Sequence, residues 1–218
     1  MPATVVTFTV QLGSGGFAIA HQVAERLGYR YFDWEITSEA AARAGVAPED
    51  VAASEHVPSF LERIMRRLLS ASAIGTEESS VVIAAEPALV NAAVQSLGSE
   101  DYRRFIERVV VELAEHGDAV IVGHAAAVIL KDKPGTLKAL IHGSLAERTR
   151  RLASEQDLSS SEAEQMIRQS DKDRYELFSR AYKINWLDAT NYDLAFKTDR
   201  NDEALIVETI LEAVKAVP

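Results

Sequence analysis

Hydrophobic residues near the start of the chain change their spacing between two short segments. Residues 5–10 are nearly all β-branched or aromatic, as in a buried strand. Apolar residues then recur every four positions, at Ile19, Val23 and Leu27. This spacing places them in one apolar stripe along a helix. Gly28 is typical of a residue that ends a helix, and residues 29–33 predict a second short strand. This order predicts the first βαβ unit of a parallel sheet.

The alternation of strand and helix patterns continues in the second half of the chain. Largely apolar runs predict strands at 118–122, 137–141 and 192–196. Amphipathic spacing and capping residues predict helices, which cover about 99–116, 144–154, 159–182 and 205–214. We therefore predict an α/β fold with a five-stranded parallel sheet.

Residues 40–100 differ from the rest because they are helical in tendency and contain only one ambiguous apolar run, at 81–85. No internal repeat and no low-complexity linker interrupts the chain. We predict one domain over residues 1–218, with its core at 1–40 and 100–218 and an inserted helical region at about 40–100.

Composition and charge narrow the classes of function. With 47% hydrophobic and 26% charged residues, the chain resembles a folded globular protein rather than a disordered or fibrous one. The 33 acidic and 23 basic residues give a net charge of −10, which repels a polyphosphate backbone, so we predict no nucleic-acid partner. The absence of cysteine excludes disulfides, thiolate metal sites and cysteine nucleophiles.

The N-terminal segment bears on the compartment. The apolar stretch at 5–10 is too short to span a bilayer, and the first basic residue is Arg26. We predict neither a secretory signal nor a membrane anchor, and hence a cytoplasmic protein. The oligomeric state stays open, a homo-oligomer included.

A glycine cluster lies between the first strand and the first helix, where α/β proteins bind phosphate. It comprises Gly13, Ser14, Gly15 and Gly16. Bare backbone N–H groups and the positive end of a helix together favour an anion there. The alternative is a tight turn that needs positive φ angles and binds nothing.

Segments along most of the chain share motifs with one family. They are QLGSGGFAIAHQVAERLGYRYFDWEI at 11–36, GDAVIVGHAA at 117–126, HGSLAERTRRLASEQDLSSSEAEQMI at 142–167, DKDRY at 171–175 and NWLDATNYDLAFKTDR at 185–200. In this order they resemble the cytidylate-kinase-like proteins, relatives of the nucleoside monophosphate kinases. The resemblance runs from residue 5 to about 200, and residues 40–100 contribute little to it.

The resemblance implies a P-loop kinase fold of three layers, with a lid at about 158–185. It implies transfer of the terminal phosphoryl group of ATP to a nucleoside monophosphate, CMP by family analogy, with Mg²⁺ bridging the donor phosphates. Residues 13–16 would then hold ATP. However, the family pattern places Gly16 where the P-loop lysine stands and Ala18 where the metal-binding Ser or Thr stands. Val10 replaces the first glycine, and Phe17 stands where relatives often carry an arginine.

Other basic residues are candidates to neutralise phosphate in place of that lysine. Arg148 and Arg151 share a helical face after the fourth strand, and Lys172 and Arg174 lie in the predicted lid. The alternative for both pairs is a solvated helix surface that pairs with nearby acids.

Two further residues are candidates for the acceptor side. Asp33 closes the second strand and could position a metal-bound water or the acceptor, or it could cap the next helix. His124 stands where the family usually has an arginine, so it is a candidate for the acceptor phosphate or a structural histidine. Tyr182 and Trp186 near the lid could stack on a base or simply pack.

Three functions follow from these motifs. The first is an ATP- and Mg²⁺-dependent phosphotransferase that acts on a small-molecule nucleotide. The second is a kinase-like binding or regulatory module that has lost turnover, since the lysine, the hydroxyl and the arginine are missing from positions 16, 18 and 124. The third is a structural oligomerisation protein in which GSGG is only a turn.

Overall fold

The structure, a computed structural model, describes residues 3–33 and 99–217. The chain divides into two compact units, one formed by Met1–Phe32 and His116–Pro218 and the other by Asp33–Glu115. The second unit contains helix α6 (Ser99–Glu115). The predicted helical region at 40–100 lies outside the described residues except for its last two.

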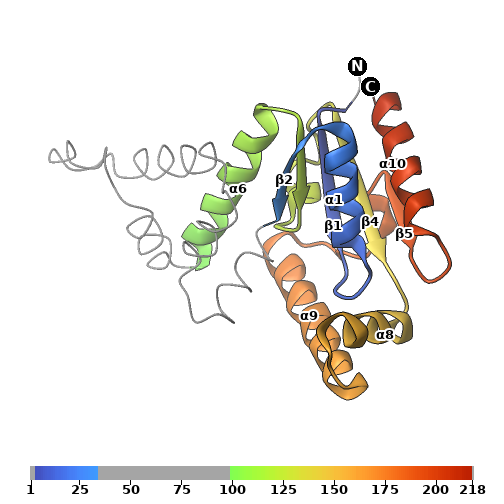
Figure 1. The fold of residues 1–218 in the computed structure, drawn as a ribbon. Coiled ribbons are helices and arrows are strands. Elements are labelled where there is room, and N and C mark those ends of the chain that lie inside the picture. Colours follow the sequence, from blue (N-terminus) through green and yellow to red (C-terminus); the bar gives the residue numbers. More distant parts are fainter. Residues whose placement is uncertain (1–2, 34–98, 218) are drawn as a thin grey trace, which may run out of the picture. The chain divides into compact units, whose positions relative to one another are not determined.

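Five strands form the sheet predicted from the apolar runs (Figure 1). They are β1 (Val5–Val10), β2 (Arg30–Asp33), β3 (Ala119–Val122), β4 (Thr136–His142) and β5 (Leu194–Lys197). Their order is β2-β3-β1-β4-β5, and β1 pairs in parallel with both β3 and β4. The register places Val5 opposite Ala119 and Thr136. The prediction of a five-stranded parallel sheet in an α/β fold is confirmed.

One face of the sheet packs against helices α1 (Gly16–Leu27) and α10 (Glu203–Ala216), which lie together in Figure 1. Ile19 and Val23 of the α1 stripe are buried there and Leu27 is partly buried, as the spacing predicts. Gly28 ends α1 in the left-handed conformation, with φ 67° and its N–H bonded to Ala24 O. This packing fixes the start of α1 against the carboxyl end of β1.

Helices α8 (Leu145–Gln156) and α9 (Ser160–Ala181) follow β4 and pack on each other through Leu152, Ala163 and Ile167. A short helix, α7 (Ala126–Ile129), follows β3, and a 3-10 turn, η2 (Ala189–Asn191), precedes β5. Beyond α9, Trp186 is only 1% exposed and stacks on Phe178. Of the two alternatives for Trp186, packing therefore holds.

Strand order determines where a ligand can enter. The chain leaves β1 toward β2 on one side of the sheet, and later crosses from β3 to β4 on the other side of β1. The carboxyl end of β1 therefore lies at a topological switch point, the usual ligand position in open α/β sheets. The glycine cluster at 13–16 follows β1 at this point.

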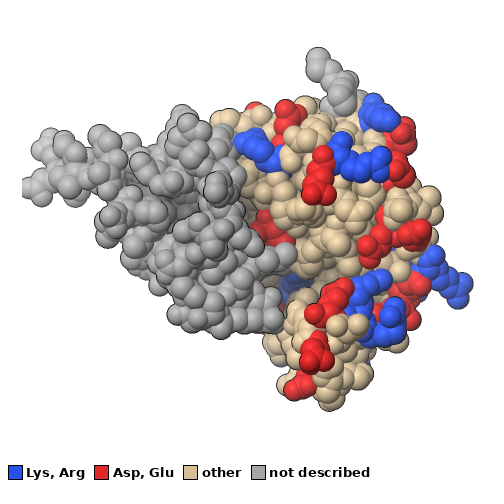
Figure 2. Space-filling view, in the orientation of Figure 1, with Lys and Arg blue, Asp and Glu red and all other residues tan. Residues whose placement is uncertain are grey.

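Charged side chains are intermingled on the face shown in Figure 2, where acidic groups accompany most of the basic ones. On helices α8 and α9, Arg150 pairs with Glu147 and Arg168 pairs with Glu164. Among the described residues, no helix is long and apolar enough to cross a membrane.

The start of α9 gives a first prediction. Ser159 caps this helix, and Ser159 and Glu162 form a reciprocal capping box. We expect Ser159→Ala to lower the free energy of unfolding by about 1 kcal/mol. Urea denaturation followed by circular dichroism measures the change, with Ser161→Ala in the first turn as the matched control. Equal stability of the two variants would show that the cap contributes nothing.

Candidate phosphate site at the start of helix α1

The turn between β1 and α1, residues 11–16, is here called the glycine turn. Gly13 and Gly15 adopt left-handed φ angles of 75° and 76°, which other residues rarely adopt. The Ser14 N–H donates to Gln11 O at 3.0 Å and closes the loop. Glycine is therefore required at two positions of the cluster by the backbone itself.

The glycine turn presents unused hydrogen-bond donors. Within residues 3–33 and 99–217, no group accepts a hydrogen bond from the amides of Gly13, Gly15 or Gly16. The Ser14 hydroxyl is also buried without a partner in this part of the chain, and Ser14 is 1% exposed. Buried donors without partners are costly. Together with the N-terminus of a twelve-residue helix, they form a cradle that fits phosphate oxygens.

Gly13 lets helix α8 approach the turn closely. A Cβ atom placed on Gly13 would lie 2.5 Å from the backbone oxygen of Arg148. Any larger residue at position 13 would push the two segments apart. The same approach brings two arginines of α8 to the turn.

Gly16 is closed in by packing. A Cβ atom at this position would lie 2.7 Å from Val10 Cγ1 and 2.9 Å from Ile141 Cβ. Because Val10 stands where the P-loop pattern has its first glycine, the two departures from that pattern at positions 10 and 16 are sterically coupled. The lysine position is thus filled by the core of the sheet.

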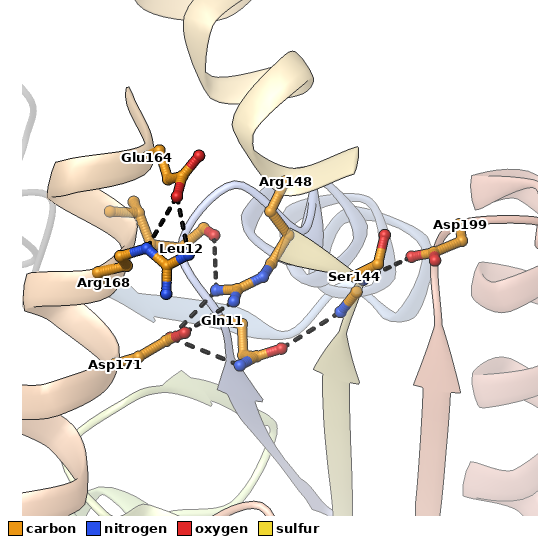
Figure 3. Close-up of polar contacts among 9 residues, drawn as sticks. Gln11, Leu12, Ser144, Arg148, Glu164, Arg168, Asp171 and Asp199 are labelled. Atoms are coloured by element: carbon orange, nitrogen blue, oxygen red, sulfur yellow. Dashed lines mark hydrogen bonds and ion pairs between the residues drawn. The ribbon is translucent and has the colours of Figure 1, made fainter. Parts of the chain in front are cut away.

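Arg148 is held by a partly buried ion pair, drawn in Figure 3. Its two terminal nitrogens donate to the carboxylate of Asp171, at 3.0 Å from Nη1 and 2.7 Å from Nη2. Nη1 also donates to Leu12 O at 3.4 Å. Arg148 therefore reaches the glycine turn, but its charge is matched by a carboxylate of α9.

Arg151 reaches the same turn with neutral partners. Its Nη1 donates to Gly13 O at 3.1 Å and to Thr198 Oγ1 at 3.4 Å. No acidic side chain of the described residues forms an ion pair with it. Its guanidinium carbon would lie 3.5 Å from a Cβ atom on Gly15, and Glu203 Oε1 would lie 3.0 Å from the same atom. Gly15 is therefore flanked by the guanidinium of Arg151, which forms no ion pair with the described residues, and by the carboxylate of Glu203.

The other two predicted basic residues lie on α9. Lys172 is exposed on α9. Arg174 lies over the ring of Trp186, with its guanidinium carbon 5.5 Å from the ring centre. Their predicted role in neutralising phosphate stays a prediction.

The two acceptor-side candidates lie at the ends of strands. His124 follows β3, beside β1, in a run of three left-handed residues with φ angles of 79°, 51° and 55° at 123–125. A left-handed non-glycine residue costs roughly 1–2 kcal/mol, so this turn is strained. Asp33 is the last residue of β2, as predicted. Their roles also stay predictions.

Sequence reasoning missed several polar residues around the turn. Gln11 Nε2 donates to Asp171 Oδ1 at 3.4 Å, and Gln11 Oε1 accepts from the Gly143 N–H at 3.3 Å. Asp199 accepts from the Ser144 N–H at 2.8 Å, and this hydrogen bond lowers the pKa of Asp199 below its usual range. Asp171 belongs to the family motif DKDRY, and Asp199 belongs to the TDR that ends the family segment 185–200. Their places in these motifs could have marked them as candidates.

The residues present fit the phosphates of a nucleotide better than they fit a metal ion. The amides of the glycine turn, the Ser14 hydroxyl and Arg151 are all donors suited to phosphate oxygens. Neither Phe17, which directly follows the lysine position, nor Ala18 offers an oxygen to Mg²⁺, and the described residues contain no cluster of three or more acidic or histidine side chains that could hold a metal. Mg²⁺ would therefore depend mainly on phosphate oxygens and water.

Comparison with known proteins settles the family. The sequence model of the cytidylate kinase-like family matches residues 5–200. This chain belongs to the cytidylate kinase-like family. The resemblance seen in the sequence motifs is thereby confirmed, and no curated protein sequence matches the chain.

Solved structures share the fold of this cytidylate kinase-like protein. An uncharacterized protein from Eubacterium ventriosum ATCC 27560 is 20% identical with a TM-score of 0.60, and the match covers 96% of this chain and 97% of that one. A gluconokinase from Sinorhizobium meliloti 1021 is 16% identical with a TM-score of 0.50, covering 98% and 91%. At such identities the likeness shows the fold alone, which is that of P-loop kinases.

Position 16 gives a prediction about the closed lysine site. We expect Gly16→Ala to lower the free energy of unfolding by about 1–3 kcal/mol, because its methyl group collides with Val10 and Ile141. Val10→Ala in the same chain removes the nearest of these atoms. The double variant should therefore be more stable than the sum of the single effects by roughly 0.5–3 kcal/mol, as measured by urea denaturation. Strict additivity would contradict the steric coupling.

His142, the last residue of β4, gives a prediction for pH. Burial lowers the pKa of His142, and nearby Lys197 and Arg148 lower it further. The unfolded chain therefore binds this proton first, and stability falls as the pH drops below about 6.5 toward the lower folded-state pKa. Between pH 7.5 and 5.5, we expect His142→Gln to flatten the decrease in melting temperature. Exposed His116→Gln is the control, and an unchanged slope in His142→Gln would refute the assignment.

Proposed function

We propose that this chain binds ATP at the glycine turn and transfers its terminal phosphoryl group to a nucleoside monophosphate. The observation that carries the proposal is the set of donors without partners on the turn at Gly13, Ser14, Gly15 and Gly16. Family membership supports phosphoryl transfer as the reaction class and CMP as the first acceptor to test. Mg²⁺ would enter bound to the donor phosphates.

We assign different roles to the two arginines of α8. Arg151 contacts the phosphates, because its charge lies beside Gly15 and is not matched by a carboxylate in the described residues. Arg148 orients the turn and does not contact the phosphates, because both of its terminal nitrogens donate hydrogen bonds to Asp171. A guanidinium without an acidic partner is the better phosphate ligand, because it need not give up an ion pair on binding.

The chemistry that the residues supply is positioning and charge neutralisation. Phosphoryl transfer leaves little covalent work to the protein, so donors fixed around the phosphates supply most of the rate. The turn amides and Arg151 would hold the donor phosphates. His124, Asp33, Lys172 and Arg174 remain candidates for the acceptor and the lid.

A coupled assay with ATP, Mg²⁺ and each common nucleoside monophosphate tests the activity. We expect nucleoside diphosphate to form, with CMP tested first. A protein that binds ATP in calorimetry but forms no product with any acceptor would contradict the enzyme proposal.

That outcome would favour a second candidate function, a kinase-like binding module without turnover. Two observations support this candidate. Packing of Val10 and Ile141 leaves no room for a side chain at position 16, and neither Phe17 nor Ala18 carries the hydroxyl that helps to hold the metal. Nucleotide binding that does not respond to Mg²⁺ would agree with it.

Arg151→Met tests the phosphate contact. Loss of a charged hydrogen bond to phosphate should weaken ATP binding by about 10–100-fold. Calorimetric titration measures the affinity, and the melting temperature reports whether the variant is folded. Arg150→Met is the matched control, because Arg150 is exposed on the same helix and pairs with Glu147 at 2.8 Å. Equal affinities in the two variants would remove Arg151 from the site.

A further inference from the structure

Asp171, in the middle of α9, joins three segments that are distant in the sequence (Figure 3). Its carboxylate accepts two hydrogen bonds from Arg148, at 3.0 and 2.7 Å, and a third from Gln11 Nε2 at 3.4 Å. The Arg148 side chain is 5% exposed and that of Asp171 is 28% exposed. The pair is therefore largely shielded from solvent. Charge-assisted hydrogen bonds are stronger in such a shielded environment than in water.

Both partners of Asp171 contact the glycine turn or its neighbours. Arg148 Nη1 donates to Leu12 O, and Gln11 belongs to the turn and also accepts from the Gly143 N–H. The remaining guanidinium nitrogen, Arg148 Nε, is buried and has no hydrogen-bond partner in the described residues. Asp171 is therefore the acid of the described residues that holds this side chain. The orientation of Arg148 consequently depends on Asp171.

We propose that Asp171 is a positioning residue that holds the glycine turn in its anion-binding conformation through Arg148 and Gln11. The inference rests on the proposed function, because the turn is the proposed phosphate site. It also gives α9, the helix of the predicted lid, a direct link to that site. Movement of α9 and binding at the turn are then coupled, since the same carboxylate serves both.

Neighbouring acids on α9 have a different environment. Asp173 accepts from Gln169 Nε2 at 2.7 Å, and Glu164 pairs with Arg168, in both cases within the exposed helix. None of these contacts reaches residues 11–16. Asp173 is therefore a matched control two positions away from Asp171.

The first measurement needs no ligand. Amide exchange of Ser14, followed by NMR on the full chain, reports how often the turn opens, because this N–H bonds to Gln11 O. We expect Asp171→Asn to raise the exchange rate about tenfold, a local opening, while Asp173→Asn leaves it unchanged. An exchange rate in Asp171→Asn equal to that of the wild-type protein overturns the proposal.

The second measurement is the dissociation constant of ATP. A small displacement of positioned groups weakens an interaction strongly, so Asp171→Asn should lose about tenfold or more in affinity and Asp173→Asn none. If the wild-type protein binds no ATP, the proposed function fails while the exchange measurement still decides the role of Asp171. If ATP binds and Asp171→Asn binds it equally well, the positioning role fails instead.

A third variant separates positioning from stability alone. Replacing a buried ion pair with apolar residues of similar size commonly preserves stability, so Arg148→Met with Asp171→Leu should keep the wild-type melting temperature. The methionine at position 148 cannot donate a hydrogen bond to Leu12 O. We expect fast Ser14 exchange and weak ATP binding to persist in this double variant. Recovery of both together with stability would show that the pair is only structural. The double variant also provides the test if Asp171→Asn fails to fold.

Discussion

The start of α1 imposes the constraint on which the site depends: N–H groups of a buried turn face a space where no other described part of the protein accepts their hydrogen bonds. Packing on both sides keeps them there. The backbone of Arg148 abuts Gly13, and the core of the sheet abuts Gly16. A turn held in this way cannot rotate its amides toward internal acceptors, which leaves them available for the phosphate that we propose binds here.

The cation of the site then has to come from another element. In the P-loop pattern a lysine extends from the turn itself, whereas here Val10 and Ile141 fill the space beside residue 16. Arg151 approaches from α8 and is anchored to the carbonyl of Gly13. Its planar guanidinium presents two parallel N–H donors in a fixed geometry that matches two phosphate oxygens, whereas an ammonium group is a compact point charge. The nearby carboxylate of Glu203 opposes binding of a bare polyanion, and a bound Mg²⁺ would reduce that repulsion.

Much of the fold followed from local sequence signals. The strand at 5–10, the stripe of α1, its end at Gly28 and the helix at about 159–182 all lie where the pattern predicts them. β5 begins two residues later than predicted, at Leu194 rather than Tyr192. Tyr192 instead uses its hydroxyl to bond Trp186 O at 2.5 Å, a contact that the apolar pattern does not reveal.

The site was less accessible to such reasoning. The glycine cluster indicated a phosphate turn, and the spacing of Arg148 and Arg151 placed both on one helix face. The different contacts of the two arginines, from which we propose different roles, involve Asp171, 23 residues after Arg148, and Gln11, 160 residues before Asp171. Contacts between such distant positions are set by the packing of α8 on α9, which no local pattern contains. The closure of position 16 could have been suspected, because a β-branched residue replaces the first glycine of the motif.

The most direct test of the central claim is NMR titration of the isotope-labelled chain with ATP and, separately, with inorganic triphosphate. Backbone amides that hold phosphate oxygens should shift strongly and saturably. We predict the largest changes at the amides of Gly13, Gly15 and Gly16 with both ligands. Saturable shifts elsewhere, with these three amides unmoved, would contradict the account.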